Sequence, residues 1–136
     1  MRILSLPWWE GDAQRARVGE WLAAQSSGRD GRVEIWVNHA PPLGSRTCWS
    51  GKRDLGDGAI AGWIGIHQPD LVVCGHVHNA PYYPDGSWLD RIGETQVTNG
   101  GRQTGEAPAT IVVEIEACTL TWCGMEGCES APLAHL

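Results

Sequence analysis

Two histidines separated by one residue follow a run of apolar residues, Leu71–Cys74, and a glycine, Gly75. An apolar run that stops at a glycine is typical of a buried strand that ends in a sharp turn. On extended backbone, residues i and i+2 point to the same side, so His76 and His78 can face one point in space. Imidazoles that converge on one point are common ligands of transition metals. This stretch therefore predicts half of a metal site at the end of a strand, with a pair of surface loop histidines as the alternative.

A third histidine, His39, follows another predicted strand. Residues 32–37 are rich in β-branched side chains and run directly into Asn38-His39-Ala40-Pro41-Pro42. A helix is predicted over 58–67, between this strand and the one at 71–74. A strand–helix–strand unit makes its two strands parallel, and the carboxyl ends of parallel strands meet at one edge of the sheet, where ligands usually bind. His39, His76 and His78 are therefore the candidate metal ligands.

The other elements are predicted from local patterns. Asp57 is expected to cap the helix over 58–67, and Asp12 a helix over 13–25. His67, near a helix end, and His135 do not share the placement of the three candidate ligands. Further predictions are a strand over 2–6, a surface loop over 43–55, and short strands over 87–91, 94–98, 109–116 and 119–123 that form an antiparallel meander.

Composition limits the possible functions. A chain of 136 residues is one domain, and its 42% apolar content is that of a globular protein. The formal charge of −6 argues against a general nucleic-acid or anionic-membrane surface. A phosphate substrate remains compatible, since a bound divalent metal reverses the local field. No segment approaches the roughly 20 apolar residues of a membrane span.

The cysteines favour a cytoplasmic protein. There are five, an odd number, without the pattern of a disulfide framework. Cys118, Cys123 and Cys128 recur every five residues, which matches no common zinc spacing. They are expected to be ordinary thiols.

Three short motifs, in this order, resemble the calcineurin-like metallophosphoesterase family. They are Asn38-His39-Ala40-Pro41-Pro42, Gly75-His76-Val77-His78 and Asn99-Gly100-Gly101-Arg102. Each is weak alone, but together with a β-rich stretch closing the chain they are fairly specific. The resemblance covers residues 2–122 and the later half of the family's pattern. It divides the chain into a metallophosphoesterase-like domain, 1–123, and a tail, 124–136.

The resemblance implies an α/β fold with mixed β-sheets and flanking helices, like the later half of the family's α/β/β/α sandwich. It implies a site with two divalent metal ions, among which Mn, Fe, Zn and Ni are not distinguished, and a phosphate ester as substrate. By the same analogy His39 and His76 ligate one metal and His78 the other. Asn99 and Gly101 match a turn of the family, but Gly100 replaces its usual proline, which leaves a role of this turn in substrate binding open.

The family's earlier motifs, Asp-x-His, Gly-Asp and Gly-Asn-His followed by an acid, are not found in the sequence. The bridging carboxylate, the asparagine ligand and the usual catalytic histidine thus have no counterparts. Three explanations stay open. The chain is the carboxyl part of a longer enzyme, or relies on a partner chain. It carries a reduced site, such as a single metal on His39, His76 and His78. Or it is a non-catalytic remnant or metal-binding module. The first also predicts exposed apolar strands, such as Leu71–Cys74.

Overall fold

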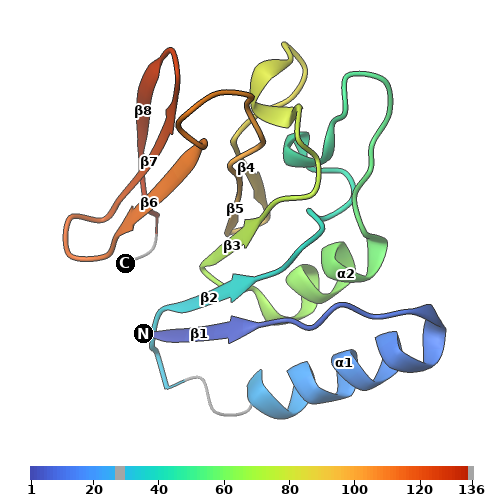
Figure 1. Cartoon of the computed structure of the whole chain (residues 1–136). Coiled ribbons are helices and arrows are strands. Elements are labelled where there is room, and N and C mark those ends of the chain that lie inside the picture. Colours follow the sequence, from blue (N-terminus) through green and yellow to red (C-terminus); the bar gives the residue numbers. More distant parts are fainter. Residues whose placement is uncertain (27–29, 135–136) are drawn as a thin grey trace.

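The computed structural model describes residues 1–26 and 30–134, which form two helices, two short 3₁₀ turns and two sheets (Figure 1). In chain order the elements are β1 (Arg2–Ser5), α1 (Gly11–Ser26), β2 (Glu34–Val37), η1 (Arg46–Cys48), α2 (Gly58–His67), β3 (Leu71–Cys74), η2 (Ala80–Tyr82), β4 (Leu89–Ile92), β5 (Thr95–Asn99), β6 (Thr110–Glu114), β7 (Thr119–Gly124) and β8 (Gly127–Pro132).

The larger sheet has the strand order β1-β2-β3-β5-β4. Strands β1, β2, β3 and β5 run parallel, and β4 pairs antiparallel with β5 at the edge. The smaller sheet is an antiparallel meander, β6-β7-β8. The fold is thus α/β with mixed sheets, as expected, and the predicted parallel pairing of the strands before His39 and His76 is confirmed.

Helices α1 and α2 cover one face of the larger sheet, and the smaller sheet lies against its other face (Figure 1). On the helix side, Leu22 of α1 and Ile64 of α2 pack with Trp36 of β2, and all three are fully buried. On the other side, Leu71 of β3 packs with Leu120 of β7. The order of layers is therefore helices, mixed sheet, antiparallel sheet.

The predicted cap of α2 is confirmed, since the Asp57 carboxylate accepts hydrogen bonds from the backbone N–H groups of Ala59 and Ile60 at 2.7 and 3.1 Å. The prediction that Asp12 caps α1 is wrong. The helix begins at Gly11, and Asp12 lies inside its first turn, where it forms an ion pair with Arg15 at 2.7 Å. None of the helices in the described ranges is long and apolar enough to cross a bilayer.

The strand predicted over 94–98 pairs antiparallel with the preceding strand, as expected, but it does not continue into the antiparallel meander β6-β7-β8. As β5 it pairs parallel with β3, and all five of its residues are buried. Its polar side chains are satisfied inside the protein: the Thr95 hydroxyl donates to the Pro69 carbonyl at 2.7 Å, and the Gln96 amide donates to the Pro132 carbonyl at 2.9 Å. Such partners let a polar sequence form an inner strand.

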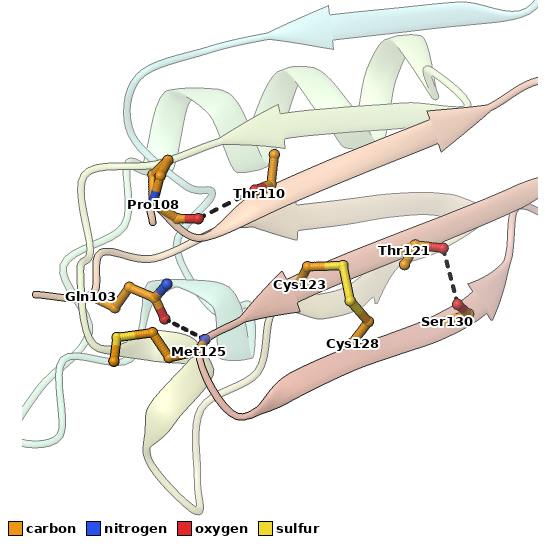
Figure 2. The surroundings of a disulfide bond; sticks show 8 residues. All are labelled: Gln103, Pro108, Thr110, Thr121, Cys123, Met125, Cys128 and Ser130. Carbon is orange, nitrogen blue, oxygen red and sulfur yellow. Dashed lines mark hydrogen bonds between the residues drawn. A yellow bond between two sulfur atoms is a disulfide. The ribbon is translucent and has the colours of Figure 1, made fainter. Parts of the chain in front are cut away.

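The residues from 124, predicted as a tail, are not separate from the fold. Gly127–Pro132 form β8 and pair with β7, and Leu133 is buried in the core between the sheets. Figure 2 shows Cys123 of β7 joined to Cys128 of β8 by a disulfide. The expectation that these two cysteines are thiols is wrong, because the hairpin makes them direct cross-strand partners. His135 lies outside the described residues.

Two further expectations change. Within the predicted surface loop over 43–55, Thr47 and Cys48 of η1 are fully buried. Strand β3, expected to be exposed in a partial domain, is central, with Leu71 and Val72 fully buried. Exposed apolar residues of the larger sheet lie instead on the edge strand β1, where Ile3 is 59% exposed, and at the end of β2, where Val37 is 40% exposed.

Candidate metal site

The candidate site lies at the carboxyl edge of the parallel strands. His39 lies two residues beyond the end of β2, and His76 lies two residues beyond the end of β3. The backbone continues the parallel pairing past both strands, since Asn38 N–H donates to the Val73 carbonyl at 3.0 Å and Gly75 N–H donates to the His39 carbonyl at 3.1 Å. This pairing holds the two histidine loops side by side.

The two imidazoles meet directly. Nε2 of His39 lies 3.1 Å from Nδ1 of His76, and the ring centroids are 4.9 Å apart. Both histidines are exposed, and the Trp8 indole, which follows β1, packs edge-on against the His39 ring at 5.4 Å. The pair is therefore reachable from solvent and has an aromatic ring on one side.

This arrangement suits two ligands of one metal ion. Nitrogens bound to a tetrahedral zinc at about 2.0–2.1 Å lie about 3.4 Å from each other, close to the observed separation. The same distance also fits a direct hydrogen bond between one protonated and one unprotonated nitrogen. Within residues 1–26 and 30–134, no group of three or more His, Cys, Asp and Glu side chains could hold a metal. The described residues thus fit part of a metal site and lack its carboxylates.

His78 does not complete a group of three ligands with His39 and His76. The sequence argument assumed extended backbone over 76–78, but His76 has a φ of +62°, in the left-handed region. Val77 turns into the core, where it is 2% exposed, and His78 lies in the exposed turn that follows. The premise that residues i and i+2 face the same point therefore fails at His76. Gly75, expected to take the unusual conformation, has no positive φ.

A buried asparagine holds this turn in place. The Nδ2 group of Asn99, at the end of β5, donates to the carbonyls of Thr47 and Val77 at 2.9 and 3.0 Å. Its Oδ1 accepts from Gly101 N–H at 2.9 Å. Asn99 is fully buried, so these three bonds account for its polar atoms away from water. It joins the loop at η1, the His76–His78 turn and the turn at Gly101, which is a positioning role.

Sequence reasoning missed the contact of Trp8 with His39 and the groove that starts beside His78. This groove, about 1170 Å³ in volume, lies between η2, the loop at 102–104 and the β7–β8 hairpin. Of the motifs in the sequence only Asn99-Gly100-Gly101-Arg102 reaches it, through Arg102, because its walls come from three segments far apart in the chain. The placement of Trp8 could have been anticipated, since it follows β1 at the same edge as the histidines.

Comparisons with known proteins bear on the fold. No protein-family model matches the sequence, and no curated protein matches it. One solved crystal structure aligns with a TM-score of 0.56 at 17% sequence identity, over 96% of this chain and 46% of its own. The protein TT1561 of Thermus thermophilus aligns at 15% identity with a TM-score of 0.44, over 88% of this chain and 42% of its own. This chain spans less than half the length of both. The first likeness supports the α/β fold.

Proposed function

We propose that this chain takes part in the metal-dependent hydrolysis of phosphate esters, as the carboxyl part of a calcineurin-like metallophosphoesterase site. The observation that carries the proposal is the pair of imidazole nitrogens, His39 Nε2 and His76 Nδ1, 3.1 Å apart at the carboxyl ends of the parallel strands β2 and β3. The three motifs in family order support it, and their strand-end positions agree with ligand binding at this edge.

In this proposal His39 and His76 bind one divalent metal, and His78 binds a second one when the remaining ligands are present. Bound divalent metals polarise a phosphoryl oxygen and supply hydroxide at neutral pH. The chain's own contribution is to orient imidazoles: the Gly75–His39 backbone bond sets the distance between the two loops, and Asn99 holds the turn that carries His76 and His78.

The carboxylates needed for two metals distinguish three forms of the proposal. In the first, another segment or a partner chain supplies them. In the second, three imidazoles and an open position act on one metal, as in some zinc enzymes, which requires His78 to leave the turn that now holds it away from His39 and His76. In the third, which is the alternative function, the chain binds metal without catalysis. Within the described residues no third ligand joins the pair, so the second and third forms both start from two protein ligands.

The test is hydrolysis of p-nitrophenyl phosphate and bis-p-nitrophenyl phosphate in the presence of Mn²⁺, Zn²⁺, Fe²⁺ or Ni²⁺, with and without EDTA. We expect activity that EDTA removes and that His76→Asn lowers at least tenfold. Asparagine is chosen because it tolerates the left-handed conformation of this position. The control is His67→Gln, a histidine on α2 whose ring lies near Trp36 and away from this edge. Metal-dependent activity that is equal in both variants would contradict the proposal, and metal binding without any hydrolysis would favour the metal-binding module.

The proposal includes a cytoplasmic location. Three of the five cysteines are free thiols, Cys48, Cys74 and Cys118. The Cys123–Cys128 disulfide is of a kind that persists mainly in oxidising compartments. Thiol labelling of the protein taken directly from its native cells decides the question: a reduced pair supports the cytoplasm, and an oxidised pair contradicts it.

A further inference from the structure

Strand β8 leaves one edge of the smaller sheet open. Within the part of the chain that the structure describes, β8 pairs with β7 alone. Gly124 pairs with Gly127 across a two-residue turn, so hydrogen-bonded and non-hydrogen-bonded pairs alternate from there along the hairpin. Cys128 and Ser130 belong to non-hydrogen-bonded pairs, and their backbone N–H and C=O groups therefore point away from β7. Both residues are exposed, so this edge is a template for one more strand.

The open edge of β8 borders the groove between η2, the loop at 102–104 and the β7–β8 hairpin. Cys128 lines this groove, and so do the rings of Tyr82 and Tyr83, which are 42% and 44% exposed. The Tyr82 ring packs edge-on against Trp122 of β7, so these rings offer an apolar surface. The groove volume of about 1170 Å³ exceeds the roughly 300–1,000 Å³ of common small-ligand pockets. A side chain of a strand added to β8 therefore has room to enter it.

The charges in the groove favour a basic partner. Two carboxylates, Glu126 and Glu129, line it against one cation, Arg102. Neither carboxylate forms an ion pair within residues 1–26 and 30–134, and Glu129 Oε2 accepts from a neutral donor, the Trp88 indole, at 2.8 Å. A guanidinium is well matched to a carboxylate, and the formal charge of −6 on the whole chain adds to the attraction of a cation. The groove is thus complementary to an arginine side chain.

The direction of the β8 side chains assigns positions to an added strand. Ala131 packs against the core between the two sheets, so Glu129, two residues earlier, faces the same side. Cys128 and Ser130 face the other side, where Ser130 bonds the Thr121 hydroxyl at 2.9 Å (Figure 2). A strand paired with β8 would place one side chain beside Glu129 and another, two residues away, beside Ala131. A basic residue suits the first position and an apolar residue the second.

The hairpin is fixed in place before any partner binds. The Gln103 side-chain oxygen accepts from Met125 N–H at 2.9 Å, which ties the loop at 102–104 to the tip of the hairpin (Figure 2). The Trp122 indole donates to the Gly100 carbonyl at 3.0 Å, and a disulfide joins β7 to β8. The edge and the groove thus have a preformed shape, which lowers the entropic cost of binding.

From this combination we infer that the open edge of β8 binds an extended, basic segment of another protein as an additional strand, with an arginine side chain in the groove beside Glu126 and Glu129. Backbone hydrogen bonds to Cys128 and Ser130 supply the pairing, and the two carboxylates select the basic side chain. The surface is independent of the proposed metal site, because none of the three candidate histidine ligands lines the groove. The inference therefore goes beyond the proposed function and requires no metal.

The test is an NMR titration of the whole chain, in EDTA, with the capped peptide Thr-Val-Thr-Arg-Thr-Val-Thr and with the same peptide carrying Glu in place of Arg. We expect the Arg peptide to bind about tenfold more tightly or better, since a charge-assisted contact separates the two. Hydrogen exchange at the Cys128 and Ser130 amides should slow when it binds, whereas the Glu129 amide, which already bonds to β7, should not change.

Two variants separate the backbone contribution from the charge. Ser130→Pro removes an N–H that points away from β7, as the neighbouring Pro132 already lacks one, and should weaken the Arg peptide about tenfold; Ser130→Ala keeps the N–H and is its control. Glu129→Gln keeps an acceptor for the Trp88 indole and should also weaken the Arg peptide about tenfold. Its control is Glu20→Gln, an exposed carboxylate of α1. The NMR spectra check that the variants are folded.

The inference is overturned if neither peptide binds, if the Arg and Glu peptides bind equally well, or if Ser130→Pro binds the Arg peptide like Ser130→Ala. Sedimentation of the chain alone tests the other occupant of this edge, a second copy of the chain. A dimer that Ser130→Pro dissociates and Ser130→Ala does not would assign the edge to self-association, and would also overturn the inference. A monomer that binds the Arg peptide, with slowed exchange at Cys128 and Ser130, is the expected result.

Discussion

The most informative single substitution is Asn99→Ala, because one buried side chain satisfies three separate backbone groups. Removing it leaves the carbonyls of Thr47 and Val77 and the N–H of Gly101 without these partners. A buried polar group left unpaired costs about 1–3 kcal/mol, so two or three of them predict a loss of about 3–5 kcal/mol in the free energy of unfolding. The measurement is equilibrium unfolding in urea.

A matched control lies at the same edge of the sheet. Asn38 is also buried, but its side-chain amide donates one hydrogen bond, to the Ala40 carbonyl at 2.6 Å. Asn38→Ala should therefore cost about 1–2 kcal/mol. If Asn99→Ala costs no more than Asn38→Ala, the account of Asn99 as a clamp of three loops is refuted.

A second variant, Asn99→Asp, keeps the shape of the side chain but replaces the donating amide with oxygen. The new carboxylate would face two carbonyl oxygens, which disfavours its charged form and raises its pKa in the folded state above the unfolded value of about 3.9. The folded state then binds more protons, so the stability of the variant relative to the unchanged protein is expected to fall as pH rises from about 4 to about 7. A difference that does not depend on pH would contradict this reasoning.

Three further predictions concern glycine and cysteine. Gly101→Ala should unfold at much lower urea than Gly75→Ala, because Gly101 has a φ of +67° and an added Cβ would lie 2.8 Å from the His78 carbonyl oxygen, whereas a Cβ at Gly75 meets nothing within 4 Å; equal midpoints would be inconsistent with this geometry. Cys123→Ser should lower the free energy of unfolding by about 2 kcal/mol, because it removes a disulfide between cysteines five positions apart. Dithiothreitol should lower the melting temperature of the unchanged protein but not of the variant. Burial raises the pKa of Cys74 from 9.0 to about 12, so the folded protein keeps a proton that the unfolded chain releases. The free energy of unfolding should therefore fall as pH rises above about 9. Measured in urea, Cys74→Ala should lose less of its free energy of unfolding between about pH 8 and about pH 10 than the unchanged protein does.

Much of the sheet could be predicted from the sequence, because its strands and turns carry strong local signals. The apolar run at Leu71–Cys74 and the Asp57 cap needed no tertiary information. The antiparallel pairing of β4 with β5 follows from the sequence, but the parallel pairing of β5 with β3 does not, because its Thr and Gln side chains suggest partial exposure and their internal partners are distant residues. Strand β8 was missed because its residues are mostly exposed and depend on pairing with β7.

The site was predicted as far as topology determines it. Parallel strands bring their carboxyl ends together, and this alone places His39 next to His76. The position of His78 depends on the left-handed backbone of His76 and on the hydrogen bond from the Asn99 side chain to the Val77 carbonyl. No local sequence pattern indicates either feature. The groove depends on three distant segments, so it could be found only once they were folded together.

The central claim, that His39 and His76 are ligands of one metal, is tested most directly by titrating Zn²⁺ into the chain and its variants. We expect His39→Asn and His76→Asn each to weaken Zn²⁺ binding at least tenfold. Loss of a residue that only supports a metal ligand already lowers metal affinity about tenfold or more, and loss of a ligand itself should cost no less. His67→Gln should bind Zn²⁺ like the unchanged chain. If all three variants bind Zn²⁺ equally well, the pair at the sheet edge is a hydrogen-bonded pair of surface histidines, and the account is contradicted.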